Sequence, residues 1–504
     1  MSLVSNTFLI FVLLALVVYY IVPKHFQWIV LLLFSYVYYM WGGPKYVFYI
    51  LFSTAAVYFF GRLITHLEET GASKKTLKLT VAAGLIVNLG MLGIVKYSAP
   101  FTALLNSVTG TQHAWLNLVF PLGISFYTFQ SSGYLLDVYW DRVKAEKNIF
   151  KFALFVSFFP QLLQGPIGKF GKLHHQFFEE HRPDAENFKY GMYRILTGFA
   201  KKMIIADWAG VFADAIWADM DMYNGIALFG LLFYGIQLYA DFSGAMDVVI
   251  GTARLFGIEL DENFRRPYLA TSMADFWKRW HITLGDWMMN YVFYPISLSK
   301  WMMGFAKHTK KIFGRRMGRV IPIALADIIV FFFVGIWHGA SMKYVVYGFL
   351  NGGIIAFSEL LTYQYRDWKK ALHISGRETW WHVFMIVRTF IIVNLRWFFD
   401  RSDTLGDAAY MIKCACTHFD PSQLFQIPAG SAGTAFVPYA LLIIAVGSII
   451  MVVLGTMQEI GKEPYEKVKA MPAAGVFAVY AVLFVLIGFL GSTAAPRGFI
   501  YAQF

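Results

Sequence analysis

Residues 321–340 read IPIALADIIVFFFVGIWHGA, and this stretch decides the class of protein to which the chain belongs. Up to Trp337 it holds one charged side chain, Asp327, and it is long and apolar enough for a membrane-spanning helix. His338 ends the apolar run. Because a polar ring at membrane depth is costly unless it meets a partner or a polar cavity, His338 is a candidate functional residue.

The whole chain shares this apolar character. Of its 504 residues, 58% are hydrophobic and 15% are charged, whereas soluble domains hold about 25% charged residues. Its mean hydropathy is +0.53, and its 49 Phe, 29 Tyr and 15 Trp suit a protein whose aromatic rings line bilayer interfaces. We predict one all-α, polytopic integral-membrane domain over residues 1–504, with about 11–13 transmembrane helices and further re-entrant or interfacial helices.

The predicted transmembrane segments are apolar runs of about 20 residues. They lie at residues 7–23, 26–43, 46–64, 79–97, 118–139, 149–165, 190–217, 224–250, 321–338, 344–362, 381–399, 434–456 and 473–493. The first run, from Thr7 to Val22, is predicted to be a retained helix rather than a signal peptide. No basic residue precedes it, and no small-residue cleavage pattern follows it.

Basic residues lie mostly in short segments between the apolar runs, as the positive-inside rule predicts, so the net charge of +12 argues for a membrane protein and against nucleic-acid binding. The loop 299–320 contains no acidic residue. Its basic residues are Lys300, Lys307, Lys310, Lys311, Arg315, Arg316 and Arg319. We therefore place this loop in the cytoplasm, and we place the nearly uncharged loop 98–117 and the loop with Asp219 and Asp221 outside.

Two apolar stretches are interrupted by proline and glycine, FPLGIS at 120–125 and FPQLLQGP at 159–166. Irregular backbone at membrane depth survives only where it is buried in protein or lines a cavity. Either stretch alone is typical of a proline kink, whereas the two together indicate a perforated core.

A second histidine, His281, also follows a tryptophan, in FWKRWH at 276–281. It belongs to the amphipathic segment 254–298, which we expect to lie at the interface or to re-enter the membrane. On a helix, Trp277, Trp280 and His281 would share one face with Leu284. Asp275 and Arg279, four residues apart, would pair on another face.

The two histidines are expected at different depths. His281 precedes the basic loop and would approach from the inner side, whereas His338 would lie well across the bilayer, up to about 25 Å along a straight helix. A path that joins them would connect the cytoplasm to the exterior. A structural role stays open for each: His281 as an interfacial residue of an aromatic belt, and His338 as a hydrogen-bonded contact to a neighbouring helix.

Imidazole suits general-base chemistry because its pKa lies near operating pH, and acyl transfer to a hydroxyl needs such a base without needing a protein nucleophile. The chain lacks the H-E-x-x-H, phosphate-loop and nucleophile-elbow motifs, and its two cysteines, Cys414 and Cys416, are too close together and too few for a disulfide or a metal site. Asp241, in the apolar run 224–250, is either an orienting partner of a histidine or part of a polar cluster between helices.

These residues lie in stretches that resemble the membrane-bound O-acyltransferase family, and in particular its bacterial branch with the alginate O-acetyltransferases. The resembling stretches are FPLGISFYTFQ (120–130), FPQLLQGPI (159–167), DFSGAMDVVIG (241–251), ENFRRPYLATSMADFWKRWHITL (262–284) and GIWHGA (335–340). The resemblance implies a funnel-and-tunnel fold of many helices, with His338 as the essential catalytic residue and His281 as the second key histidine.

The resemblance also implies substrates. An acyl group, above all acetyl, would pass from a cytoplasmic thioester, either acetyl-CoA or an acyl carrier protein thioester, to a hydroxyl of a cell-envelope or secreted polysaccharide. No tightly bound cofactor and no metal are expected. The expected partners are membrane lipid, the acyl donor, and the extracytoplasmic polysaccharide or a partner acetyltransferase protein, and the expected location is the bacterial plasma membrane.

Further site residues follow from these motifs. The residues expected to line the passage are Trp337, Gly339, Trp277, Trp280, Asp241, Ser243 and Gln164. The cations that would attract an anionic donor, or would simply be solvated, are Lys278, Arg279, Arg265 and Arg266.

Two alternatives stay open. The similar teichoic acid D-alanyltransferases share both histidine motifs, and the chain departs from the alginate branch at Asn290, where that branch usually has aspartate. A transporter or flippase that makes no covalent bond is the competing class.

Overall fold

The computed structural model describes the chain except for residues 113–117, 119–120, 429, 493–497 and 501–504. The described part is helical and contains no strand beyond a single bridge between Phe264 and Trp280, so the prediction of an all-α fold is confirmed. Phe120, which begins the first interrupted stretch, and the last residue of the predicted segment 473–493 lie outside the described residues.

The chain divides into two compact units. Unit 1 comprises residues 1–199, 245–262 and 498–504, and unit 2 comprises residues 200–244 and 263–497. Unit 1 contains α1 (Asn6–Ile21), α2 (Gln27–Met40), α3 (Val47–Glu69), α4 (Lys74–Thr109), α5 (Ile124–Tyr139), α6 (Ile149–Ser157), α7 (Phe170–Phe178) and α8 (Ala185–Phe199). The long helix α10 (Ala227–Leu255) contributes to both units.

Unit 2 holds the remaining helices. They are α9 (Asp207–Ala218), α11 (Met273–Arg279), α12 (Ile282–Met288), α13 (Tyr294–Ser297), α14 (Lys300–His338), α15 (Met342–Leu360), α16 (Thr362–Ala371), α17 (Thr379–Leu395), α18 (Trp397–Arg401), α19 (Leu405–Thr417), α20 (Val437–Glu459), α21 (Pro464–Lys469) and α22 (Ala473–Leu490). Two π-helical turns, Ala200–Ala206 and Met289–Phe293, precede α9 and α13.

Seven helices of the described residues are long and apolar enough to cross a membrane, or eight if the bent pair α15 and α16 forms one span. The sequence predicted 11–13. The difference arises because several predicted spans form shorter helices, such as α1, α2, α5 and α6, and because the predicted segment 190–217 is divided between α8, a π-helical turn and α9.

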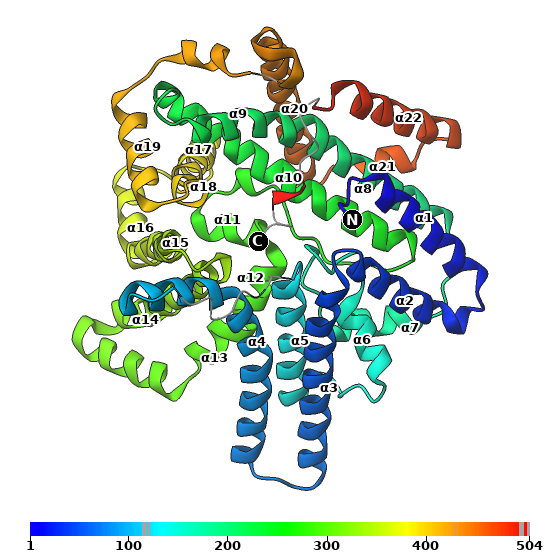
Figure 1. The fold of residues 1–504 in the computed structure, drawn as a ribbon. Helices are drawn as coiled ribbons and strands as arrows, with labels where there is room; N and C mark the ends of the chain where they lie inside the picture. Colours follow the sequence, from blue (N-terminus) through cyan, green and yellow to red (C-terminus); the bar gives the residue numbers. More distant parts are fainter. Residues whose placement is uncertain (113–117, 119–120, 429, 493–497, 501–504) are drawn as a thin grey trace. The chain divides into compact units, whose positions relative to one another are not determined.

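In unit 1, helices α3, α4 and α5 lie side by side (Figure 1). Asn88 of α4 is fully buried between them: its amide oxygen accepts a 2.7 Å hydrogen bond from the Ser53 hydroxyl of α3, and its amide nitrogen donates to the hydroxyls of Ser131 and Ser132 of α5, each at 2.9 Å. A satisfied polar cluster of this kind stabilises helix packing where lipid surrounds the bundle.

The two interrupted stretches pack against each other in unit 1. Gly123 has φ of 76°, and a Cβ atom there would lie 2.5 Å from the carbonyl oxygen of Leu162, so only glycine fits at this contact. The second stretch forms buried turns between α6 and α7, in which the Gln161 amide donates to Gln130 of α5 at 3.2 Å. The irregular backbone is therefore buried in protein, one of the two settings in which membrane proteins tolerate it.

In unit 2, α14 is two helical arms joined at Gly314, whose φ of 76° and ψ of 174° break the helix. The predicted loop 299–320 is therefore mostly helical, a result that the sequence did not predict. The second arm packs along α15 at very short range, since a Cβ atom on Gly335 would lie 2.4 Å from the Tyr344 carbonyl oxygen and one on Gly348 would lie 2.5 Å from that of Phe331. Small residues allow this close approach of two membrane helices.

Candidate active site

His281 occupies a break between two short helices. Helix α11 ends at Arg279, α12 begins at Ile282, and His281 has φ of 48° and ψ of 52° in the left-handed region. The prediction that Trp277, Trp280 and His281 share the face of one helix is therefore wrong. Left-handed backbone costs a non-glycine residue roughly 1–2 kcal/mol, so surrounding contacts must hold it in place.

Asn263 supplies that contact. Its Oδ1 atom accepts hydrogen bonds from the backbone N–H and the hydroxyl of Thr283, both at 3.0 Å, and lies 3.2 Å from Nδ1 of His281. Because a backbone N–H can only donate, the Asn263 atom is the oxygen, and Nδ1 of His281 must carry the proton to bond with it. The lone pair then lies on Nε2.

The charge state of His281 agrees with this arrangement. The side chain is 2% exposed, and burial lowers its pKa from 6.5 to about 3. Desolvation disfavours the charged imidazolium, so His281 is neutral at physiological pH.

His338 lies at the carboxyl end of α14 and is buried. Its ring stacks against Tyr344, with centroids 6.0 Å apart, and meets the edge of Tyr347 at 5.6 Å. Both tyrosines belong to α15. Since a helix carries partial negative charge at its carboxyl end, this position stabilises a positive charge on the imidazole. Gly339 is required beside it, because a Cβ atom there would lie 2.5 Å from the Tyr344 ring.

Trp337 brings the two histidines into one site. Its ring lies 5.9 Å from that of His281 and 4.9 Å from that of His338. Phe242 of α10 contacts His281 from a third direction at 5.0 Å. The sequence placed the histidines at separate points along a route through the membrane, whereas the structure has both against the same indole.

The other two predicted tryptophans, Trp277 and Trp280, pack among further aromatic residues. Trp280 stacks on Phe276 at 5.4 Å and meets Trp397 at 5.7 Å. The Trp277 ring lies 5.0 Å from Phe331 of α14. These two tryptophans contact other aromatic residues, whereas Trp337 contacts both histidines.

Arg396 was not singled out from the sequence. It is 1% exposed, and its guanidinium carbon lies 4.2–5.7 Å from the ring centroids of four aromatic residues. Those residues are Phe276, Trp277, Tyr347 and Trp397. The guanidinium donates to Asn351 and, at 3.3 Å, to the hydroxyl of Tyr347. Through Tyr347 this buried cation is one contact away from His338. An arginine in the apolar run 381–399 was the sequence signal that could have revealed it.

Asp241 pairs with a lysine. The Lys202 amine donates to Asp241 at 2.7 Å and also binds Asp207 at 2.8 Å, and both Lys202 and Asp241 are almost fully buried. Burial disfavours the charged lysine, but the two carboxylates outweigh that effect and raise the pKa of Lys202. This geometry corresponds to a polar cluster between helices, the second of the two interpretations of Asp241.

Two other predicted lining residues, Ser243 and Gln164, are buried polar residues. Ser243 is buried, and its hydroxyl has no hydrogen-bond partner among the described residues. Gln164 belongs to unit 1, where it is buried in the turns between α6 and α7.

The four predicted donor-attracting cations divide into two pairs. Arg279 binds both carboxylate oxygens of Glu459 at 3.0 Å and pairs with Asp275 at 2.8 Å, as its spacing predicted, and Arg266 binds Glu459 at 2.7 Å. Hydrogen bonding to Glu459, opposed by burial, raises the pKa of Arg279. Arg265 and Lys278 are exposed and form no ion pair with a described residue. They alone remain candidates for attracting an anionic donor.

Comparison with known proteins supports the motifs quoted above. The model of the family "MBOAT, membrane-bound O-acyltransferase family" matches residues 141–306, a range that includes His281. The chain is 30% identical to the probable alginate O-acetylase AlgI of Pseudomonas syringae pv. tomato over 448 residues, which cover 87% of this chain and 80% of that protein.

Two further relatives have other acceptors in their names. The peptidoglycan O-acetyltransferase of Helicobacter pylori is 31% identical over 76% of this chain and 72% of its own length. The teichoic acid D-alanyltransferase of Bacillus subtilis is 26% identical over 55% of this chain and 67% of its own length. With its apolar helices, its paired histidines and this similarity, the chain belongs to the membrane-bound O-acyltransferase family and is a multi-pass membrane enzyme that transfers acyl groups to oxygen.

Proposed function

We propose that this enzyme transfers an acetyl group from a cytoplasmic thioester to a hydroxyl of a cell-envelope or secreted polysaccharide, at the inner membrane of a bacterium. The observation that carries the proposal is that the two histidines, fifty-seven residues apart in sequence, are both buried against Trp337. Support for acetyl comes from the relatives: two O-acetylating proteins match at 30–31% identity over most of the chain, whereas the D-alanyltransferase matches over 55% of it.

In the proposed reaction His338 is the general base. The imidazole takes the proton of the acceptor hydroxyl while that oxygen attacks the carbonyl carbon of the thioester. The new C–O bond forms, the C–S bond breaks, and the imidazolium returns the proton to the thiolate, so the products are an ester and a thiol. The carboxyl end of α14 stabilises the imidazolium during this step.

His281 would have a different part. It is neutral, with its proton fixed at Nδ1 by Asn263, and this leaves a hydrogen-bond acceptor at Nε2 inside an apolar setting. We assign it to positioning of substrate beside Trp337, while Arg265 and Lys278 would favour the approach of an anionic donor such as acetyl-CoA or an acylated carrier protein.

The test measures the covalent product of the reaction. In a strain that lacks the native gene, we would compare the wild-type protein with His338→Ala and His338→Asn and measure ester-linked acetate on isolated envelope polymers. Losing the base should cost about 10²–10⁴-fold in transfer. Exposed His382 of α17 offers the matched control, His382→Ala, which should retain full activity.

Three outcomes would contradict the proposal. Wild-type acetylation by a folded His338→Ala protein would remove the catalytic assignment. Release of D-alanine instead of acetate from the polymer would show that the transferred acyl group is D-alanyl, while the proposed transfer to a hydroxyl would still hold. An envelope composition that is the same with and without the gene, together with movement of an unmodified solute, would indicate a transporter.

A further inference from the structure

The first arm of α14 turns back on the second at Gly314. A Cβ atom on Gly318 would lie 2.3 Å from the Cα atom of Lys310, so the two arms touch backbone to backbone at that point. The Thr309 hydroxyl donates to the Gly318 carbonyl at 3.1 Å and fixes the contact. The two arms are therefore packed directly against each other at the start of a helix long and apolar enough to span the membrane.

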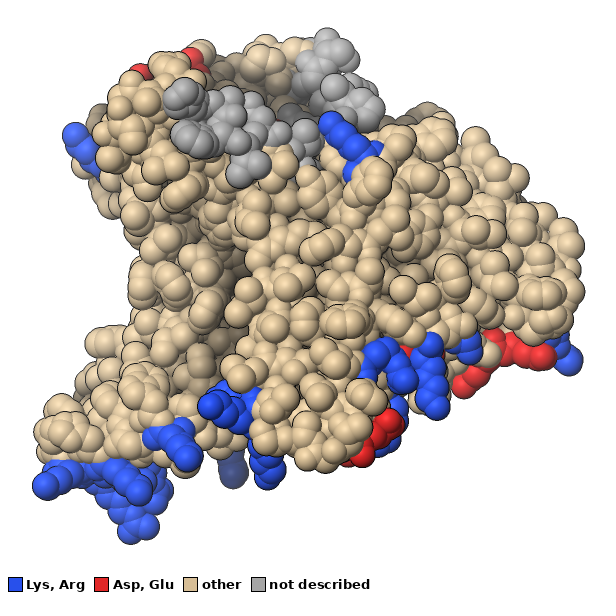
Figure 2. Space-filling model, turned by 60° about the horizontal axis from the view of Figure 1, so that its bottom comes forward, with Lys and Arg blue, Asp and Glu red and all other residues tan. Residues whose placement is uncertain are grey.

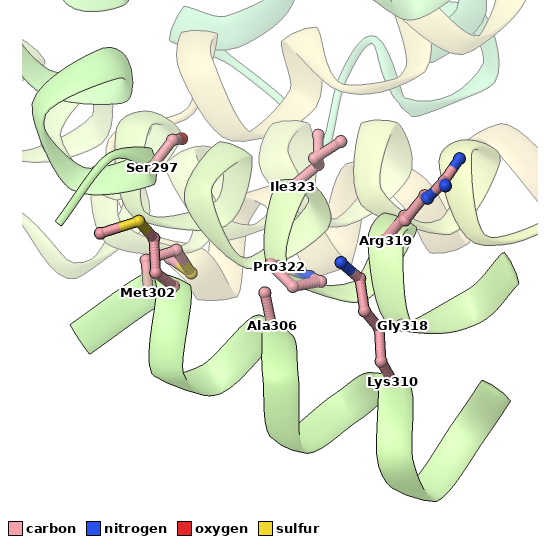
Figure 3. A pocket seen from close by; sticks show the side chains of 9 residues that line it. Ser297, Met302, Ala306, Lys310, Gly318, Arg319, Pro322 and Ile323 are labelled. Atoms are coloured by element: carbon pink, nitrogen blue, oxygen red, sulfur yellow. The ribbon is translucent and has the colours of Figure 1, made fainter. Parts of the chain in front are cut away.

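A groove of about 340 Å³ lies in the angle between the arms and the end of α13 (Figure 3). Its lining is apolar apart from two cations and one hydroxyl. The lining residues are Ser297, Met302, Met303, Ala306, Lys310, Gly318, Arg319, Pro322 and Ile323. A groove of this volume falls within the range of small-ligand sites, and this lining suits a ligand with an apolar body and an anionic end.

The charge around the groove is of one sign. Residues 299–320, which contain the first arm and the turn, have seven Lys and Arg residues and no acidic one, and neither Lys310 nor Arg319 forms an ion pair with a described residue. Figure 2 shows the cluster at the lower left, over α14. Unlike Arg266 and Arg279, which share Glu459, these cations have no carboxylate within residues 299–320 to neutralise them.

Large apolar side chains share this surface with the cations. Trp301 is 60% exposed and Phe313 is 57% exposed on the first arm, and Ile323, in the groove itself, is 45% exposed. A helix with exposed aromatic and basic residues lies in the membrane interface, with its apolar groups in lipid and its cations at the headgroups. With the hairpin in that position, the apolar side of the groove would face lipid and its cations would face the headgroups.

We infer that this groove binds an anionic phospholipid of the cytoplasmic leaflet, with the phosphate between Lys310 and Arg319 and an acyl chain along Met302, Met303 and Ile323. Lysine and arginine donate charge-assisted hydrogen bonds to phosphate oxygens, and basic pockets at the inner face of membrane helices suit anionic headgroups. The site includes the first turns of the second arm of α14, which ends at His338. Bound lipid would hold the beginning of that arm in place.

The experiment measures lipid retained by the full-length protein. The protein is reconstituted with phosphatidylglycerol or with phosphatidylcholine, extracted in mild detergent, and examined by native mass spectrometry. The paired variant Lys310→Gln with Arg319→Gln should bind phosphatidylglycerol about thirtyfold more weakly, because it loses two charge-assisted hydrogen bonds to the phosphate that contribute about 1 kcal/mol each. The matched control is Lys307→Gln with Lys311→Gln, which removes the same charge from the same arm outside the groove. It should change affinity by less than about threefold, an effect below about 0.7 kcal/mol.

A second variant distinguishes the loss of a lipid contact from a loss of folding. Lys310→Arg keeps the charge and should retain the lipid. Equal losses in the paired variant and its control would show diffuse attraction to the hairpin and would overturn the site. Equal retention of phosphatidylcholine would overturn the recognition of charge.

Two further measurements identify which anion the groove binds. Displacement of the lipid by inorganic phosphate alone would reassign the groove to free anions. Retention of a soluble acyl carrier protein in place of the lipid, lost with Lys310 and Arg319, would reassign the surface to a protein partner.

Discussion

At the scale of single residues, His281 combines two costs that folding must offset: a left-handed backbone and a fully buried imidazole. Asn263 meets both, since one amide oxygen accepts bonds from His281 and from the first turn of α12. The FWKRWH motif revealed the histidine but not Asn263, because a partner eighteen residues away is joined through tertiary folding. Arg396 was missed for a similar reason, as its aromatic cage combines the neighbouring Trp397 with Phe276, Trp277 and Tyr347 from two distant stretches of the chain.

The buried state of His281 predicts a pH-dependent stability. The pKa of His281 is about 3 in the folded protein, whereas an exposed histidine of the unfolded chain has the usual value of 6.5. Between these pH values the unfolded chain therefore binds a proton that the folded chain does not. The free energy of unfolding that comes from the neutral His281 is fully present above pH 6.5. It is lost as the pH falls toward 3, at about 1.4 kcal/mol per pH unit. Thermal unfolding in detergent at pH 7 and pH 5 should therefore show a larger drop in Tm for the wild type than for His281→Gln. Exposed His382→Gln should behave as the wild type, and an equal drop in all three proteins would contradict the buried neutral state.

At the scale of elements, the sequence predicted an all-α chain and the two stretches interrupted by proline and glycine, but it predicted too many spans and missed the breaks at His281 and Gly314. Trp277, Trp280 and His281 were expected on one helical face, whereas the helix breaks at His281, where Asn263 bonds to the first turn of α12. The basic run 299–320 suggested a loop because charges are frequent in loops, yet a helix at a membrane interface has the same composition. Gly314 was the local signal for the turn.

Helix α15 provides a test of how packing holds the site. Gly348 and Gly353 lie on the same helix, but a Cβ atom on Gly348 would meet the Phe331 carbonyl at 2.5 Å whereas one on Gly353 meets nothing within 4 Å. Gly348→Ala should push α15 from α14, destabilise the protein by about 1–3 kcal/mol and lower acyl transfer, because Tyr344 and Tyr347 on α15 contact His338. Gly353→Ala should be neutral or stabilise the helix by up to about 1 kcal/mol. Equal Tm and equal activity of the two variants would show that the close approach is not needed.

At the scale of the whole molecule, composition and motifs together were enough to predict a polytopic acyltransferase, because apolar length and family motifs are local properties of the sequence. The meeting of His281 and His338 at Trp337 was not predictable in the same way. It depends on how the segment 263–288 packs against the end of α14, and no spacing along the chain records that contact.

Orientation in the membrane is the property of the whole molecule that decides which substrate comes from which side. Residues 299–320 of the α14 hairpin carry seven Lys and Arg residues and no acidic one, so the positive-inside rule places them in the cytoplasm, and the turn around Met222, beside Asp219 and Asp221, is expected outside. A membrane-impermeant maleimide tests this after Cys414→Ala and Cys416→Ser remove the native thiols. Exposed Met222→Cys should react in intact cells, whereas exposed Lys311→Cys should react only once the membrane is opened. Labelling of both from the same side would reverse the assignment of at least one of them, and with it the proposal that the thioester donor approaches from the face that carries the α14 hairpin.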